Sequence, residues 1–456
     1  MALGGGTFIT QNKVLPGSYY NVVSATRASA TLSDRGVAAM PLELDWGKEK
    51  EIFSVTEEEL QKNSMEMFGC PYTDPKLTGI KEVLLNAKLL YVYRLNSNGE
   101  KAKNTIATAR FGGTRGNDLK IAISENPDSE PENKLYDVET LMDTKVVDTQ
   151  TVSTVTELKD NAYVVFKKEG DLVSTVATPL TGGTNGAEVK GEKHQEFLNK
   201  IESYNFNALG VPVSDSTTKK MYVAFTKRMR DEVGAKFQTV LFRENADYEG
   251  VVSVENEVEV GEDGSALMYV DDEKVSIPFC KNTALVYWVT GIIAGCNINK
   301  SNTNKKYDGE LLVKTAYTQM ELEEGIKSGK FLLHNVDGEV HVLTDINTFV
   351  SFTKEKTDDF SSNQVIRVLD QDAIETGKLF NLYYLGKVQN ITDGRSLFKS
   401  DLVALAEEMQ RMQAIENFTS EDITVEQGQG KKDVVVSKAL QPAVCMEKLY
   451  TTVTVR

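Results

Sequence analysis

Histidine and cysteine, the residues most often used as nucleophiles, bases and metal ligands, are scarce in this sequence. The three histidines and four cysteines are His194, His334, His341, Cys70, Cys280, Cys296 and Cys445. No two cysteines have the Cys-x-x-Cys spacing of a zinc ribbon or a thioredoxin-type motif, and no histidine neighbours a recognisable nucleophile signature. We therefore predict no catalytic residue, no metal site and no cofactor. The cysteines are interpreted as small buried apolar residues in a reducing compartment.

Two glycine-rich segments and two acidic runs are the remaining candidates for chemistry. Residues 181–186 lack the Lys-Ser/Thr of a phosphate-binding loop, and residues 111–118 place an arginine and an aspartate among glycines. The acidic runs 271–273 and 358–359 lack the ligand spacing of a calcium loop. Structural turns and solvated surface are the favoured interpretation. An enzyme with an α/β core at 191–330 is kept as an alternative, although no coherent catalytic set supports it.

Composition narrows the classes of partner. The 456 residues include 51 Lys+Arg and 67 Asp+Glu, for a net charge of −16. Such an acidic balance argues against binding to nucleic acid or to an anionic membrane. The N-terminus lacks a basic start and an apolar core, so we expect no signal peptide and synthesis in the cytosol. The apolar run 284–296 is too short to span a membrane and is interpreted as a buried helix.

The order of patterns along the chain predicts a mixed α/β, multidomain fold with extended arms. Helices alternate with strands in the proposed core, and short alternating runs between residues 98 and 190 are typical of a small all-β unit. The predicted parts are an N-terminal arm (1–24), an α/β core domain (25–97 and 191–345), an inserted β domain (98–190), a C-terminal helix-plus-sheet domain (346–443) and a C-terminal arm strand (444–456).

Local periodicity and capping residues predict individual elements of the core. A helix is expected at 57–68 and a strand at 88–95. Asp215 is a helix cap, and Gly234 stands where that helix would end. The residues placed on the buried face of this helix are Tyr222, Phe225, Met229 and Val233. With strands at 207–213 and 237–242 on either side, the pattern predicts a parallel βαβ unit.

The C-terminal part is predicted to contain two helices and several strands. The first helix is expected at 363–380, and Ser400 is expected to cap the second. The apolar face of the second helix is assigned to Leu402, Leu405, Ala406, Met409 and Met412. Strands are expected at 422–426, 433–437 and 448–455.

Both ends of the chain are β-prone segments with no core to pack on. Such edges invite pairing with other chains, and we interpret them as arms that donate strands to neighbouring subunits. The candidate strand residues are Thr7, Phe8, Ile9, Tyr19, Tyr20 and Val22 at the N-terminus, and Leu449, Thr451, Val453 and Val455, which face one way, at the C-terminus. Arms lent to different neighbours make head-to-tail contacts, which generate rings or helical lattices.

A series of short motifs in a fixed order gives the chain a resemblance to a known family. The motifs include Gly4-Gly5-Gly6-Thr7-Phe8, Leu15-Pro16-Gly17-Ser18-Tyr19, residues 34–47, Arg115-Gly116-Asn117-Asp118, residues 180–186, Phe206-Asn207-Ala208-Leu209-Gly210, residues 247–251, 365–370, 393–395 and 415–418, and Met446-Glu447-Lys448-Leu449-Tyr450. In this order the chain resembles the contractile tail sheath proteins of phages, prophages and phage-tail-like bacteriocins of Gram-positive bacteria.

The resemblance implies a mechanical function. Family sheaths polymerise as a helix around a tail tube and shorten to drive the tube through a cell envelope. Their N- and C-terminal arms complete a small sheet on a neighbour's C-terminal domain, which forms the inner wall. The implied partners are further copies of the chain, the tail tube protein, and baseplate and tail terminator proteins. The implied location is the host cytoplasm during assembly and then the virion or phage-tail-like particle.

The resemblance also implies a tube-facing surface within residues 345–456. Arg395, Lys399 and Arg411 are the candidates for contacts with an acidic tube, and ordinary surface charge is the alternative interpretation. A non-contractile lattice protein or adhesin shares strand donation without shortening, and it is the second functional hypothesis.

Overall fold

The computed structural model describes residues 35–130 and 134–455. The chain folds into two compact units. We call residues 35–371 and 442–455 the large unit, and residues 372–441 the small unit. The predicted N-terminal arm, with Thr7, Phe8, Ile9, Tyr19, Tyr20 and Val22, lies outside the described residues. The domain boundaries proposed from the sequence stay predictions.

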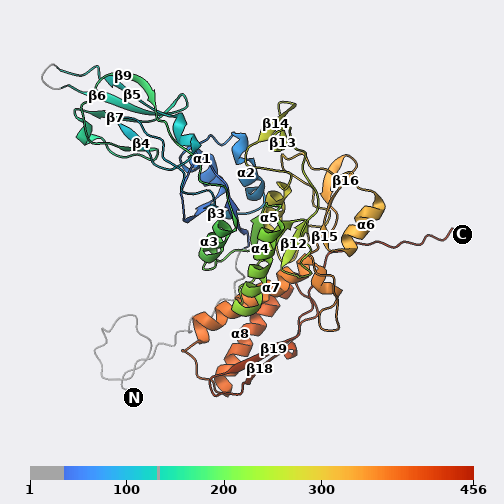
Figure 1. Ribbon diagram of the computed structural model, residues 1–456. Coiled ribbons are helices and arrows are strands. Elements are labelled where there is room, and N and C mark those ends of the chain that lie inside the picture. The colour runs from blue at the N-terminus through green and yellow to red at the C-terminus, as the bar shows by residue number, and fades with distance from the viewer. Residues whose placement is uncertain (1–34, 131–133, 456) are drawn as a thin grey trace, which may run out of the picture. The chain divides into compact units, whose positions relative to one another are not determined.

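A seven-stranded sheet forms the centre of the large unit (Figure 1). Its strands are β1 (Val37–Leu42), β2 (Ile52–Val55), β3 (Leu89–Arg94), β10 (Ala208–Val211), β11 (Gln238–Phe242), β12 (Val251–Val254) and β15 (Lys330–Phe331). The order is β15-β12-β11-β10-β1-β3-β2, and every neighbouring pair is parallel except β2 and β3. Parallel strands that are covered on both faces have nearly continuous apolar sequences. Strands β11 and β12 are of this kind, because they are buried at every position.

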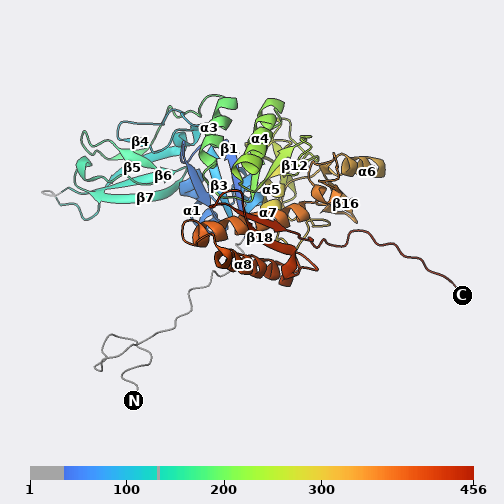
Figure 2. The same cartoon turned by 90° about the horizontal axis from the view of Figure 1, so that it is seen from below.

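Helices cover both faces of this sheet (Figure 2). The helices that lie wholly in the large unit are α1 (Glu57–Phe68), α2 (Thr78–Leu84), α3 (Gly191–Ile201), α4 (Ser216–Arg228), α5 (Leu285–Gly295) and α6 (Gln319–Lys327). Helices α1, α2 and α5 share an apolar core with one face of the sheet, and α3 and α4 share a second core with the other. Helix α5 is buried from Leu285 to Ala294, which confirms the buried helix predicted there.

The predicted βαβ unit is confirmed by β10, α4 and β11, because the two strands pair in parallel. The Asp215 carboxylate accepts a hydrogen bond from the backbone nitrogen of Thr218 (2.7 Å) and caps α4. Gly234, with φ 87°, ends a π-helical turn that follows α4. Val233 was expected on the buried face and is exposed, because the wider π turn rotates it away from the face that carries Tyr222.

Two smaller sheets are built from residues 107–179. The strands are β4 (Ala107–Ala109) paired with β8 (Val164–Phe166), and β5 (Leu119–Glu125), β6 (Tyr136–Met142), β7 (Lys145–Val152) and β9 (Thr175–Pro179) in the order β7-β6-β5-β9. These strands are antiparallel and enclose an apolar core of their own. Two further hairpins are β13 (Ala266–Val270) with β14 (Glu273–Ile277), and β16 (Leu333–Val336) with β17 (Glu339–Val342). The mixed α/β fold class predicted from the sequence is confirmed.

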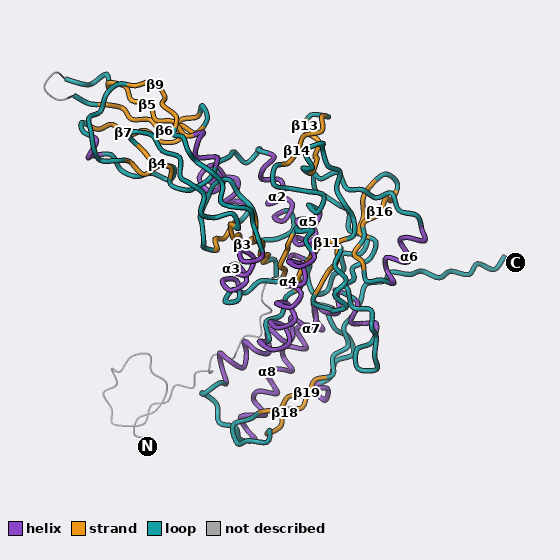
Figure 3. Tube along the Cα trace, in the orientation of Figure 1, coloured by secondary structure: helices purple, strands orange, loops and turns teal. Residues whose placement is uncertain are grey.

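The small unit consists of two helices and a hairpin (Figure 3). It contains the C-terminal turns of α7 (Asn363–Leu379), the π-helical turn η6 (Phe380–Tyr384), α8 (Thr392–Arg411), and the antiparallel strands β18 (Ile423–Gln427) and β19 (Val434–Lys438). The predicted start of the second helix at Ser400 is wrong, because α8 begins two turns earlier, where the Arg395 backbone nitrogen bonds to the Ile391 carbonyl (3.0 Å). Leu402, Leu405, Ala406 and Met409 form the buried face, as expected, whereas Met412 follows the last residue of the helix and is half-buried.

Candidate assembly interface

The C-terminal arm is an extended segment whose apolar side chains lie in water. Residues 448–455 form no strand, although the sequence predicts one there, because a strand needs a second strand to pair with. Figures 1 and 2 show this segment running away from the large unit. The exposed fraction is 90% for Leu449, 80% for Val453 and 91% for Val455. Burying such side chains is worth roughly 1.5–3 kcal/mol each, so the arm gains stability on pairing.

The hairpin of the small unit offers two open edges. The Gly428 nitrogen donates to the Asp433 carbonyl (2.8 Å), and the Ala439 nitrogen donates to the Asp422 carbonyl (2.9 Å). Because pairing alternates along an antiparallel ladder, the odd-numbered residues of β19 bond to β18. The peptide groups of Val434, Val436 and Lys438 therefore point to the outer edge. That edge pairs with no strand of the described chain.

A groove of about 480 Å³ lies beside β19. Its wall residues come from η6, the loop between η6 and α8, α8, the turn before β19 and β19 itself. They include Phe380, Tyr384, Leu385, Val388, Arg395, Phe398, Lys431, Lys432 and Val434. The floor is aromatic, because the Phe398 ring lies 4.6 Å from the Tyr384 ring and 5.7 Å from the Phe380 ring, between centroids. A strand added at the outer edge of β19 would bring its inward side chains towards this apolar floor.

The three predicted tube-facing residues all lie on α8. The Arg395 guanidinium donates to the side-chain oxygen of Asn390 (3.0 Å) and contributes to the groove. Lys399 follows one turn later and is half-exposed. Arg411 is exposed, pairs with Glu408 through its Nε (2.8 Å), and lies about 120° around the helix from Lys399. The structure therefore brings Arg395 and Lys399 together and separates Arg411 from them.

Sequence reasoning missed Lys431 and Lys432, which join Arg395 at the groove. Both lie in the turn between two predicted strands, and a pair of lysines in such a turn is the only signal that the sequence offered. Asn390 fixes this turn, because its amide nitrogen donates to the carbonyls of Lys431 (3.1 Å) and Asp433 (2.8 Å). The result is an apolar groove with three cations around it.

The two glycine-rich loops serve as structural junctions in the large unit. The Asn117 side chain donates to the Gly183 carbonyl (2.9 Å) and accepts from the Gly183 nitrogen (2.8 Å), so each loop binds the other. Arg115 donates to the Gly69 carbonyl at the end of α1 (2.6 Å) and pairs with the Asp143 carboxylate (2.5 Å). The structural interpretation of both loops is confirmed by these contacts.

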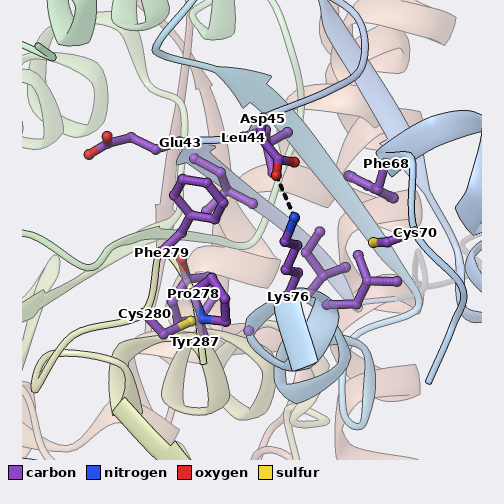
Figure 4. Close-up of a pocket in the computed structure, with 14 residues that line it drawn as sticks. Glu43, Leu44, Asp45, Phe68, Cys70, Lys76, Pro278, Phe279, Cys280 and Tyr287 are labelled. Carbon is purple, nitrogen blue, oxygen red and sulfur yellow. Dashed lines mark hydrogen bonds and ion pairs between the residues drawn. The ribbon is translucent and has the colours of Figure 1, made fainter. Parts of the chain in front are cut away.

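Two of the four cysteines line a pocket of the large unit. Figure 4 shows a small pocket in which Lys76 points towards Asp45 (2.6 Å), with Cys70 and Cys280 in its wall. Burial raises the pKa of both thiols to about 12, so they stay protonated at neutral pH. Among the described residues there is no group of three His, Cys, Asp or Glu side chains that could hold a metal ion.

The three histidines lie at two places in the large unit. His194 lies 2.8 Å from the Tyr222 hydroxyl, and burial lowers its pKa to about 4. His334 and His341 stand opposite each other on β16 and β17. No helix in the described part of the chain has the length and apolar character needed to cross a membrane.

Comparison with known families gives matches along nearly the whole described chain. Four family models match in succession: the tail sheath protein Gp18 domain III N-terminal region (residues 35–95), the phage tail sheath protein beta-sandwich domain (97–185), the phage tail sheath protein central domain (187–348) and the phage tail sheath C-terminal domain (355–456).

Individual relatives match over similar lengths. The phage-like element PBSX protein XkdK of Bacillus subtilis is 32% identical and is matched over 100% of its length and 99% of this chain. A solved sheath tail protein of Desulfitobacterium hafniense is 34% identical, with a TM-score of 0.81 over 95% of this chain and 99% of that one. The helical sheath of the anti-feeding prophage in its contracted state shares the fold at 11% identity, with a TM-score of 0.55 over 97% of this chain and 99% of that one.

Proposed function

The chain belongs to the phage tail sheath family, and we propose that it polymerises as a helix around a tail tube and contracts to drive the tube through the envelope of a target cell. It is a contractile sheath subunit, part of a phage or phage-tail-like particle. The proposed partners are further copies of itself, the tail tube protein, and baseplate and tail terminator proteins. Assembly is proposed to take place in the host cytoplasm.

The observation that carries the proposal is an exposed apolar arm and an open strand edge in one chain. Residues 448–455 expose an apolar face, and the hairpin of β18 and β19 has edges without a partner strand in the described chain. Addition of the arm as a strand would bury its apolar face and pair the open edge of the hairpin. Main-chain hydrogen bonds would supply affinity, and alternate side chains would supply register. A donor and an acceptor at different places on one subunit make head-to-tail contacts, which propagate into a helix.

The groove beside β19 supports this edge as one acceptor. If the arm pairs as a strand, Leu449, Val453 and Val455 will lie on the same side, because side chains alternate along a strand. Phe380, Tyr384 and Phe398 provide an apolar surface next to the edge of β19. Arms of extended chain also suit contraction, because rigid units can change their contacts while a tether keeps them attached.

Electron microscopy of the purified chain tests the proposal. We expect helical tubes at high concentration, and two sets of helical parameters before and after contraction when a tail tube and baseplate are present. Removal of residues 448–456 is expected to leave a folded monomer that does not assemble. A chain that stays monomeric at every concentration would contradict the sheath proposal, and tubes of constant length would favour the non-contractile lattice.

A further inference from the structure

The arm is not free along its whole length. Its first residues lie against the rest of the large unit and are held by three side chains from separate parts of it: Gln364 at the start of α7, Thr303 in the loop after α5, and Thr344 after β17. Gln364 and Glu447 are the two residues through which the contacts are made. Together these side chains form a binding site for residues 443–447.

Gln364 binds the backbone of this segment in the manner of a neighbouring strand. Its amide nitrogen donates to the Ala443 carbonyl (3.1 Å), and its amide oxygen accepts from the Cys445 nitrogen (3.1 Å). In a parallel ladder one residue bonds in the same way to the carbonyl and the nitrogen of residues two apart. Gln364 is 3% exposed, so its amide is held in place by packing. The side chain therefore recognises extended backbone rather than particular side chains.

Glu447 makes the contact that depends on side-chain identity. Its carboxylate accepts hydrogen bonds from the hydroxyls of Thr303 (2.6 Å) and Thr344 (3.3 Å). Thr303 is itself fixed, because its hydroxyl accepts from the Asp345 backbone nitrogen (3.0 Å). Asp345 pairs with the buried guanidinium of Arg367 at 2.6 Å. The buried ion pair of Asp345 and Arg367 therefore helps to fix the Thr303 hydroxyl that binds Glu447.

The segment has the two-residue period of a strand. Ala443, Cys445 and Glu447 make the hydrogen bonds to the rest of the large unit, the first two through their backbone, whereas no hydrogen bond is made by Val444 or Met446 among the described residues. The side chains of Val444 and Met446 are 60% and 102% exposed. Beyond Glu447 no hydrogen bond or ion pair holds the described arm to the rest of the chain. The boundary between the held and the free part therefore lies between Glu447 and Lys448.

We infer that Gln364, Thr303 and Thr344 form a socket that holds residues 443–447 of their own chain, so that the exchanged strand leaves the subunit from a fixed point at Lys448. The inference rests on the proposed strand exchange and adds positioning residues to it. A fixed exit point lowers the entropy that the arm loses on reaching a neighbour. It also places the load on the socket when subunits move relative to one another during contraction.

Limited proteolysis of the full chain before assembly tests the socket directly. A protease needs several residues of extended chain, so glutamyl endopeptidase is expected to cut slowly after Glu447, while chymotrypsin cuts rapidly after Tyr450 in the free part. Gln364→Ala is expected to accelerate the cut after Glu447 by about tenfold or more and to leave the cut after Tyr450 unchanged. Met446→Ala, which removes an outward side chain of the same segment, is the matched control and should change neither rate.

Thr303→Val is a second variant outside α7, and it keeps the test valid if Gln364→Ala unfolds the helix. Rapid cutting after Glu447 in the wild-type chain, or no acceleration in either variant, would overturn the socket. Both variants are also expected to need about tenfold more protein to assemble. If the variants release residues 443–447 but assemble at the same protein concentration as the wild-type chain, the positioning role is overturned. Failure of the wild-type chain and of Met446→Ala to assemble would instead count against the proposed function, while the proteolysis still decides on the socket.

Discussion

Glu82 is a carboxyl group buried inside the large unit, 1% exposed. Its Oε1 accepts a hydrogen bond from the Glu310 backbone nitrogen (2.6 Å), and its Oε2 accepts one from the Tyr307 hydroxyl (2.9 Å). Burial raises its pKa from 4.5 to about 7; the two hydrogen bonds oppose this shift, and the charges of Glu310 and Asp308 add to it. The charged form therefore costs stability at neutral pH, and the protonated form does not.

The pKa of Glu82 predicts how stability depends on pH. The folded state holds this proton up to about pH 7 and the unfolded state only to about pH 4.5, so stability falls as pH rises through that window. The contribution amounts to about 3 kcal/mol at most. Glu82→Gln, which imitates the protonated form, should be more stable than wild type at pH 8 by about that amount, and the difference should vanish near pH 4.5.

Chemical denaturation at several pH values measures the Glu82 effect. Glu323→Gln on the exposed surface of α6 is the matched control and should give no pH-dependent difference. A Glu82→Gln chain whose stability follows that of wild type at every pH would contradict the assignment.

At the scale of elements, Arg115 joins the four-stranded sheet to helix α1. Its guanidinium bonds to the Gly69 carbonyl at the end of α1 and to the carboxylates of Asp143 and Asp118 beside β5 and β7. Although burial favours the neutral form, these carboxylates raise the pKa of Arg115 further above its usual range. The side chain is 10% exposed, whereas each carboxylate is 49% exposed, so solvent weakens the pairing.

Arg115→Ala is expected to lower the free energy of unfolding by about 1–2 kcal/mol and to increase hydrogen exchange in residues 111–118. The matched control is Arg228→Ala, because Arg228 also pairs with a carboxylate (Glu202, 2.6 Å) but both partners are about 40% exposed. The control should cost less than 1 kcal/mol. Equal losses in the two variants would show that Arg115 is an ordinary surface ion pair.

Capping residues and apolar periodicity predicted those helices and strands whose bounds are set by neighbouring residues in the sequence. Helix α1 has the predicted bounds because Thr56 and Glu59 form a capping box, a pattern that can be recognised in the sequence. The start of α8 was missed because no side chain caps it at Ile391, and Ser400 offered a stronger but false signal inside the helix. The arm was predicted from its alternation, but its socket was not, because Gln364 and Ala443 meet only in the folded chain.

The outer edge of β19 makes its own prediction. Val436→Pro removes a nitrogen donor from the open edge, whereas Val435→Pro removes one that the ladder to β18 uses. We expect Val436→Pro to keep the thermal stability of the monomer and to lose assembly. Val435→Pro should destabilise the hairpin. Circular dichroism and electron microscopy together distinguish these results, and normal tubes from Val436→Pro would exclude the β19 edge as an acceptor.

At the scale of the whole molecule, the net charge is −16, so a local cluster of cations indicates a surface suited to an acidic partner. Identical acidic subunits repel one another, so assembly depends on contacts that are not electrostatic, such as apolar strand exchange. The cations Arg395, Lys399, Lys431 and Lys432 gather in the small unit near the groove. An acidic tube surface would complement them, and this pairing is our proposal for the inner wall of the sheath.

Charge reversal on α8 tests the proposed tube contact. Lys399→Glu, alone and together with Arg395→Glu, is expected to weaken tube binding by about tenfold at low salt and to have a smaller effect at high salt, because salt screens exposed charges. Arg411→Glu should weaken binding less, since Arg411 is already paired with Glu408 and lies on another side of the helix. Co-sedimentation with purified tubes measures binding in a chain that lacks residues 448–456 and so does not polymerise. Equal binding by Lys399→Glu and wild type at low salt would remove α8 from the tube interface, whereas equal losses in all three variants would indicate a general charge effect instead of a defined contact.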